Sequence, residues 1–294
     1  MACSSIESLG ADQSRIPGSA GGPGSGSGSV DDWTPVWQDP AKAVREVCRL
    51  KFDAEGPLGW SPRIRRRFGY FTPDEWYEAS LLRLVGSGTE WLDVGCGRDL
   101  FPSNKPLAKL LSSRARTLVG LDPSDNIEMN ELVHERAKCL LEEYDPDRRF
   151  DLISLRMVAE HIVDPVSAVA ALGRLTRNAG RVVVYTVSKW SPVSLLAAAT
   201  PVAVHRSLKR TLWKVLPEDT FPTAYRMNTR KELRRLFAAG GFVEESFLYL
   251  DDCRGMSWSP LTLMLELSGW RALRAVGLRY PELCLLGVYQ KRTN

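Results

Sequence analysis

The chain has 294 residues, is 44% hydrophobic and carries a formal net charge of +4. This length fits one large domain or two small ones, and the apolar content is ordinary for a soluble globular protein. The charge allows an anionic partner but does not require nucleic acid. No apolar run reaches the ~18 residues of a membrane span, so we expect no transmembrane segment, and peripheral membrane contact stays open.

The cysteines and histidines show no ligand or disulfide pattern. Six cysteines are scattered through the chain without a CxxC pair, which is typical of reduced thiols and predicts a cytoplasmic protein. The three histidines form no HxxxH or His/Cys cluster. We therefore expect no metal site.

Composition divides the chain into three stretches. Residues 1–30 are rich in Gly, Ser and Pro and cannot bury enough apolar area to fold, so we predict a disordered tail. Residues 31–83 are predicted to form an N-terminal helical cap, in which Thr72, Pro73 and Glu75 have the order of a helix N-terminus. The basic stretch 65–70 either reaches into a site or forms a solvated face. Residues 84–294 are predicted to be the main domain.

From residue 90 onward, predicted strands alternate with predicted helices. The strands are expected at residues 90–94, 116–122, 150–155, 181–187, 242–250 and 283–291. A helix and a short strand are expected within 130–141. Another helix is predicted to begin at Asp164-Pro165 and to end at Asn178-Ala179-Gly180. This alternation predicts a parallel sheet with right-handed crossovers.

Two stretches, residues 189–219 and 257–280, interrupt the alternation. The first is apolar and then basic, and it is too long for a plain connection, so a helical insertion over the active site is predicted. The second is rich in leucine and is also predicted to be a helical insertion. The two insertions predict either a covered pocket for a lipophilic acceptor or completion of the core or of a dimer interface. A monomer and a homodimer both remain open.

The sequence Leu92-Asp93-Val94-Gly95-Cys96-Gly97 predicts a buried strand that enters a glycine-rich turn. Glycines two positions apart let the backbone approach a ligand closely, because neither has a Cβ. In open α/β sheets, nucleotide-like ligands bind at the carboxyl ends of strands. A dinucleotide site would need a third glycine where Leu100 stands, and this difference weakens an NAD-binding alternative.

An ordered set of motifs resembles the class I S-adenosylmethionine-dependent methyltransferases over roughly residues 76–250. The set consists of the glycine turn and of three later motifs, which are Gly120-Leu121-Asp122, Phe150-Asp151-Leu152-Ile153 and Asn178-Ala179-Gly180-Arg181-Val182-Val183-Val184. The resemblance implies a doubly wound, Rossmann-like sheet of seven strands with an antiparallel last strand. Asp99 departs from the pattern, because the family usually has a further glycine there.

The resemblance also implies that S-adenosylmethionine binds at the turn and leaves as S-adenosylhomocysteine. Asp122 would accept the ribose hydroxyl protons, as an acid does in dinucleotide folds, or it would act as a turn acid. Arg156 would pair with the cofactor carboxylate or form a surface salt bridge. The full set of expected cofactor contacts is Asp93, Gly95, Cys96, Gly97, Asp122, Pro123, Glu142, Arg156 and Met157.

Methyl transfer from a sulfonium is an in-line displacement with an excellent leaving group, so positioning and desolvation supply much of the rate. A general base is needed only where the nucleophile keeps its proton. His161 is the candidate catalytic residue, although a histidine here in the family often packs or caps. The candidate substrate-pocket residues are Tyr70, Tyr185, His205, Tyr225 and Arg226.

These observations leave three hypotheses for function. The first is a methyltransferase that acts on a small, lipophilic or natural-product-like acceptor at oxygen. The second is an RNA methyltransferase, because Arg63–Arg67 and Arg206–Lys214 are basic. Since no known RNA-binding module accompanies these stretches, we expect a small-molecule partner rather than nucleic acid. The third is a non-catalytic cofactor-binding scaffold, motivated by the altered turn.

Overall fold

The computed structural model describes residues 40–53, 59–191, 222–278 and 280–293. The predicted tail at 1–30, His205 and nearly all of the insertion at 189–219 lie outside these ranges. The division of the chain at residues 30 and 83 stays a prediction.

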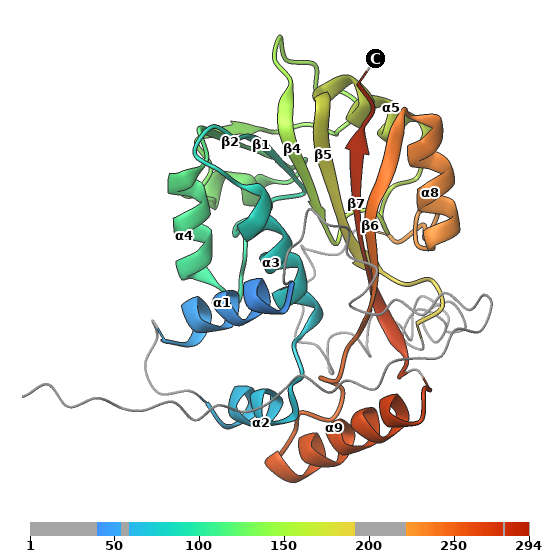
Figure 1. The fold of residues 1–294 in the computed structure, drawn as a ribbon. Coiled ribbons are helices and arrows are strands. Elements are labelled where there is room, and N and C mark those ends of the chain that lie inside the picture. The colour runs from blue at the N-terminus through green and yellow to red at the C-terminus, as the bar shows by residue number, and fades with distance from the viewer. Residues whose placement is uncertain (1–39, 54–58, 192–221, 279, 294) are drawn as a thin grey trace, which may run out of the picture.

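Within these ranges, seven strands form one sheet in the order β3-β2-β1-β4-β5-β7-β6 (Figure 1). The strands are β1 (Glu90–Val94), β2 (Thr117–Leu121), β3 (Glu135–Ala137), β4 (Phe150–Arg156), β5 (Thr176–Val187), β6 (Phe242–Asp251) and β7 (Glu282–Lys291). The first five strands run parallel, and β7 lies antiparallel between β5 and β6. The predicted Rossmann-like sheet with an antiparallel last strand is confirmed.

Helices cover both faces of the sheet, as a doubly wound fold requires (Figure 1). The described α-helices are α1 (Pro40–Asp53), α2 (Trp60–Phe68), α3 (Pro73–Leu84), α4 (Lys105–Arg114), α5 (Pro165–Leu175), α8 (Arg230–Ala239) and α9 (Pro260–Ala275). Of these, α2 and α9 pack on each other beyond the end of the sheet (Figure 1). Neighbouring residues on β1 point to opposite faces. Trp91 packs in a core with α1, α3 and α4, whereas Leu92 packs in a core with α5 and α8. The alternation of side chains along β1 therefore determines which helices each of its residues contacts.

Local capping signals set the helix starts. The Thr72 hydroxyl accepts a hydrogen bond from the Glu75 backbone, and the Glu75 carboxylate accepts one from the Thr72 backbone, with Pro73 inside the first turn. Asp164 caps α5 in a similar way, by accepting from two backbone N–H groups. Such caps satisfy N–H groups that have no partner within the helix. The predicted starts of α3 and α5 are confirmed.

Two predicted boundaries are wrong. Residues 130–141 contain β3 but no α-helix. The Asn130 side chain accepts a hydrogen bond from the Leu132 backbone and donates one to the Gly97 carbonyl. Side-chain bonds of this kind compete with helix formation. In addition, α5 ends at Leu175 rather than at residues 178–180, and β5 begins at once. Residues 178–180 belong to β5, next to a register irregularity, and Ala179 has a positive φ of 60°.

The insertion at 257–280 contains α9, which packs against α2. The Tyr70 and Trp270 rings meet edge to face at 5.3 Å between centroids. The Tyr70 hydroxyl donates to the Asp251 carbonyl and accepts from the Cys253 backbone. The predicted helical nature of this insertion is therefore confirmed. Among the described helices, none is long and apolar enough to cross a membrane.

Candidate functional site

A pocket of about 280 Å³ lies at the carboxyl ends of β1 and β4. Here the chain order reverses: β1 leads outward to β2 and β3, and β4 then returns to the other side of β1. Ligands of open α/β sheets bind at this kind of switch point. The lining residues are Asp93, Gly95, Cys96, Gly97, Arg98, Asp99, Leu100, Pro102, Asn126 and Arg156.

Gly95 makes the turn after β1 possible. Its φ is +69°, and a Cβ there would lie 2.3 Å from Cγ2 of Val158. The Gly95 N–H donates to the Leu121 carbonyl at 2.7 Å, which ties the turn to the end of β2. Gly97 has a φ of +48°, but a Cβ there would meet open space. The absent Cβ of Gly95 therefore makes room for Val158, whereas the backbone of Gly97 faces open space, which fits the predicted seat of the cofactor.

Asp93 lies on β1, lines the pocket and is almost fully buried. The Ser154 hydroxyl donates to Asp93 Oδ1 at 2.5 Å, and Trp91 Nε1 in turn donates to Ser154 Oγ at 2.7 Å. Burial raises the pKa of Asp93 to about 7, against the smaller lowering effects of Ser154 and Arg156. The carboxyl group thus titrates near neutral pH at the edge of the site.

This raised pKa predicts a pH effect on stability. An unfolded chain releases the Asp93 proton near its ordinary pKa of 3.8, whereas the folded chain keeps it until about pH 7. Unfolding therefore releases a proton between these values, and stability falls as pH rises through this window, by up to about 1.4 kcal/mol per pH unit. Asp93→Asn should flatten this part of the profile in urea unfolding without cofactor. Parallel profiles for the two proteins would contradict the prediction.

Asp122 follows β2 and contacts the glycine turn directly. Its Oδ2 accepts from the Gly97 N–H at 3.0 Å, and its Oδ1 accepts from the backbone and the hydroxyl of Ser124 at 2.8 and 2.6 Å. The turn-acid role that the sequence left open is thus present. A carboxylate has about four acceptor positions, so further hydroxyl donors can still bind. The lining described above does not include Asp122, and its ribose role stays a prediction.

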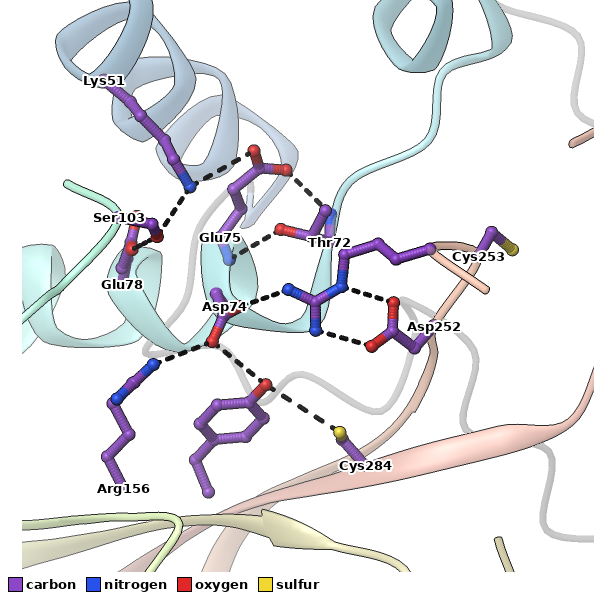
Figure 2. A network of polar contacts seen from close by, with 12 residues as sticks. Lys51, Thr72, Asp74, Glu75, Glu78, Ser103, Arg156, Asp252, Cys253 and Cys284 are labelled. Atoms are coloured by element: carbon purple, nitrogen blue, oxygen red, sulfur yellow. Dashed lines mark hydrogen bonds and ion pairs between the residues drawn. The ribbon is translucent and has the colours of Figure 1, made fainter. Parts of the chain in front are cut away.

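Arg156 ends β4 and lines the pocket. Its Nη2 lies 3.4 Å from Oδ1 of Asp74, in the first turn of α3 (Figure 2). Asp74 Oδ2 also accepts from Arg254 Nη1 at 2.6 Å. The Tyr185 hydroxyl donates to Asp74 Oδ1 at 3.3 Å. The salt bridge that the sequence left open for Arg156 therefore exists, and the same side chain still borders the pocket.

Met157, Pro123 and Glu142, which were also expected to contact the cofactor, are not among the described residues that line this pocket. Met157 has a φ of 54° and donates its N–H to the Tyr185 carbonyl at 2.8 Å. Pro123 and Glu142 are exposed. The cofactor roles of all three stay predictions.

The candidate acceptor residues fall into two groups. Tyr70 and Tyr185 are buried, their hydroxyls are hydrogen-bonded within the protein, and neither is among the described residues that line this pocket. His161, Tyr225 and Arg226 lie together instead: the Tyr225 N–H and the Arg226 side chain bond to carbonyls of residues 160 and 163. His161 Nδ1 lies 3.1 Å from the Pro222 carbonyl. The structure therefore brings His161, Tyr225 and Arg226 together, where the segment after β4 meets residues 222–226.

Sequence reasoning missed several residues of the site. Arg98, Asp99 and Asn126 line the pocket, and Arg98 Nε donates to Asn126 Oδ1 at 2.8 Å. Their position directly after β1 and β2 was the available signal, because those strand ends meet at one edge. The stretch 65–70 adds no residue to the described lining. Instead, Arg66 Nη2 donates to the Cys48 carbonyl on α1 at 2.9 Å, and Arg63, Arg66 and Arg67 are exposed.

The sheet order, the reversed β7 and the glycine turn at the switch point define an S-adenosylmethionine-dependent methyltransferase. A family model described as "Methyltransferase domain" matches residues 63–246, which is more than half of the chain. The chain belongs to this methyltransferase family.

Individual relatives have related names. The ubiquinone biosynthesis O-methyltransferase of Alkalilimnicola ehrlichii is 28% identical over 252 residues, covering 80% of this chain and 91% of the relative. The protein with the same name from Thiobacillus denitrificans is 27% identical over 62% of this chain and 73% of its own length. A crystal structure of an N-methyltransferase from Bradyrhizobium japonicum with S-adenosylhomocysteine is 14% identical, at a TM-score of 0.44, over 80% of this chain and 99% of its own.

Proposed function

We propose that the protein transfers a methyl group from S-adenosylmethionine to an oxygen of a small lipophilic molecule. The observation that carries the cofactor part is the pocket that Gly95, Cys96 and Gly97 line at the switch point of the sheet, where the missing Cβ of Gly97 leaves open space. Support for oxygen and for a lipophilic acceptor comes from the relatives, which are named O-methyltransferases of ubiquinone biosynthesis.

Four of the residues that we propose for the cofactor, Gly95, Cys96, Gly97 and Arg156, line one pocket, and Asp122 bonds to the turn at Gly97. When bound, S-adenosylmethionine supplies a methyl group on a positively charged sulfur. Gly95, Cys96 and Gly97 would seat it, Asp122 would accept from its ribose, and Arg156 would pair with its carboxylate. Two charge contacts at opposite ends and a bare backbone between them would fix the orientation that an in-line transfer needs.

His161 is suited to accept a proton from an acceptor hydroxyl. A carbonyl oxygen accepts hydrogen bonds but cannot donate them, so the 3.1 Å contact with Pro222 places the ring proton on Nδ1. In the neutral tautomer with the proton on Nδ1, the ring lone pair lies on Nε2. The neighbouring Glu160 side chain is turned into the core, where it accepts from Thr186 Oγ1 at 2.7 Å. We infer that His161 is the general base when the acceptor is a phenol or alcohol.

Methyl-labelled S-adenosylmethionine tests this function. The purified protein should transfer label to a lipophilic fraction of a bacterial extract, and mass spectrometry should identify the product as a methyl ether. Label in RNA, with binding that weakens steeply as salt rises, would instead support the RNA hypothesis. Cofactor binding without any labelled product would leave the scaffold hypothesis. The free thiols among the described residues support a cytoplasmic location for the reaction.

We also propose that the outer face of α9 contacts an anionic lipid surface. Trp258, Leu261 and Leu265 are 80%, 67% and 59% exposed, and Arg271 further along the same helix is exposed too. Within residues 254–278 the one carboxylate is Glu266, which is buried. An exposed apolar face on a helix that has an exposed arginine and no exposed acid fits an anionic membrane. A symmetric dimer through this face would bring like charges together, which disfavours a second copy as the occupant.

A vesicle assay tests this contact. We expect the protein to sediment with phosphatidylglycerol vesicles and much less with phosphatidylcholine vesicles. Leu261→Asp with Leu265→Asp should abolish sedimentation, whereas Val166→Asp, at an exposed apolar residue on α5, should not. Unchanged sedimentation of the α9 variant would contradict the proposal. The proposal would also be contradicted if the unmodified protein and Val166→Asp are dimers in gel filtration and the α9 variant is a monomer.

A further inference from the structure

Asp74 joins two parts of the chain that meet beside the pocket. It lies in the first turn of α3 with its side chain 13% exposed. One carboxylate oxygen faces Arg156 Nη2 at 3.4 Å, and the other accepts from Arg254 Nη1 at 2.6 Å. Figure 2 shows Asp74 between Arg156 and the turn that carries Asp252. One side chain therefore contacts both the end of β4 and the turn after β6.

The two arginines are paired unequally. Arg254 has its own carboxylate, because Asp252 accepts from its Nε and Nη2 at 2.6 Å each. For Arg156, Asp74 supplies the ion pair, at a longer distance and through one nitrogen. A guanidinium has five N–H donors, so this contact uses one of them. The pair sets the direction of the Arg156 side chain and leaves most of its donors available for a ligand at the pocket.

The position of Asp74 is itself well fixed. The reciprocal bonds between Thr72 and Glu75 hold the helix start on both sides of it. Although burial favours its neutral form, Arg254 and Arg156 hold the pKa of Asp74 below its ordinary value. Asp74 is thus a fixed negative charge at neutral pH, placed behind a cation that lines the pocket.

We propose that Asp74 is a positioning residue for cofactor binding, which holds the Arg156 guanidinium where it receives the carboxylate of S-adenosylmethionine. This inference rests on the proposed cofactor site. Without Asp74, Arg156 would still be charged but would lose its direction, and the ligand carboxylate would then have to order a long, rotamer-rich side chain on binding. The loss should affect ligands that carry the carboxylate and should spare those that lack it.

Calorimetry with two ligands tests the proposal. S-adenosylmethionine has the carboxylate, whereas decarboxylated S-adenosylmethionine lacks it and keeps the sulfonium and the amine. For Asp74→Asn, which preserves shape, we expect about tenfold weaker binding of S-adenosylmethionine and unchanged binding of the decarboxylated ligand. Asp252→Asn is the matched control, because it removes a partner of Arg254 alone. It should not change the ratio of the two affinities.

Arg156→Gln separates the possible failures. It should show the same selective loss, and adding Asp74→Asn to it should cause no further selective loss. If Arg156→Gln is selective but Asp74→Asn is not, the positioning role is wrong while the cofactor site stands. If Asp74→Asn weakens both ligands equally and lowers the melting temperature, its role is structural and the proposal is overturned. If the unmodified protein binds neither ligand, the proposed cofactor site itself fails.

Discussion

Gly95→Ala is expected to abolish measurable binding of S-adenosylmethionine and to reduce the free energy of unfolding by about 2–5 kcal/mol. Two costs add. A non-glycine residue with a positive φ costs about 1–2 kcal/mol, and inserting a methyl group into a packed contact costs about 1–3 kcal/mol. The contact is with Val158, 2.3 Å from the added Cβ, in the segment that follows Met157. Relief of the clash requires the turn and this segment to move apart.

Gly97→Ala is the matched control for Gly95→Ala. Gly97 also has a positive φ, but no heavy atom lies within 4 Å of its added Cβ. It should therefore lose only the conformational part, about 1–2 kcal/mol. Thermal unfolding and calorimetry of both variants measure the difference. Equal losses of stability would show that the close packing of the turn on Val158 does not determine its geometry.

Asp122→Ala is expected to weaken binding of S-adenosylmethionine by about 1–3 kcal/mol, because charge-assisted hydrogen bonds to the ribose are lost. The same substitution also removes the acceptor of the Gly97 N–H. Calorimetry on the folded variant gives the loss directly. An unchanged dissociation constant in a folded variant would show that the ribose assignment is wrong.

A control separates ribose contact from support of the turn. Ser124→Ala removes one donor to Asp122 Oδ1 and leaves both the carboxylate and its bond to Gly97 intact. We expect this variant to bind nearly as tightly as the unmodified protein. If Ser124→Ala weakens binding as much as Asp122→Ala does, the acid acts by ordering its own loop.

The parts of the fold that were predictable depend on short stretches of sequence. The short stretch before Gly95 predicts a buried strand, and every residue of β1 is buried, while Thr72 or Asp164 before a proline marks a helix start. Each of these signals acts within a few residues. The glycine turn belongs with them, because a Gly-x-Gly after a buried strand constrains the backbone locally. The switch point then follows from strand order, so the place of the pocket was predictable too.

The parts that were not predictable depend on contacts between distant segments. The Asn130 side chain, at the start of a predicted helix that does not form, donates a hydrogen bond to the Gly97 carbonyl, 33 residues earlier. Asp74 meets Arg254 across 180 residues, and from the sequence it is only one acid in a helix start. Tyr70 and Tyr185 have polar tips that suggested a pocket, but carbonyl and carboxylate acceptors in the core satisfy them. The type of a side chain alone does not determine which hydrogen-bond or ion-pair partner it has in the folded protein.

Release of S-adenosylhomocysteine with a matched set of lipophilic acceptors tests the proposed reaction most directly. The set consists of an alkyl-substituted catechol, the same molecule with both oxygens already methylated, and the corresponding diamine. We predict turnover with the catechol, a methyl ether as its product, and none with the doubly methylated molecule. Turnover of the diamine but not of the catechol would contradict methyl transfer to oxygen. Cofactor binding without turnover of any lipophilic acceptor would contradict the proposed substrate class.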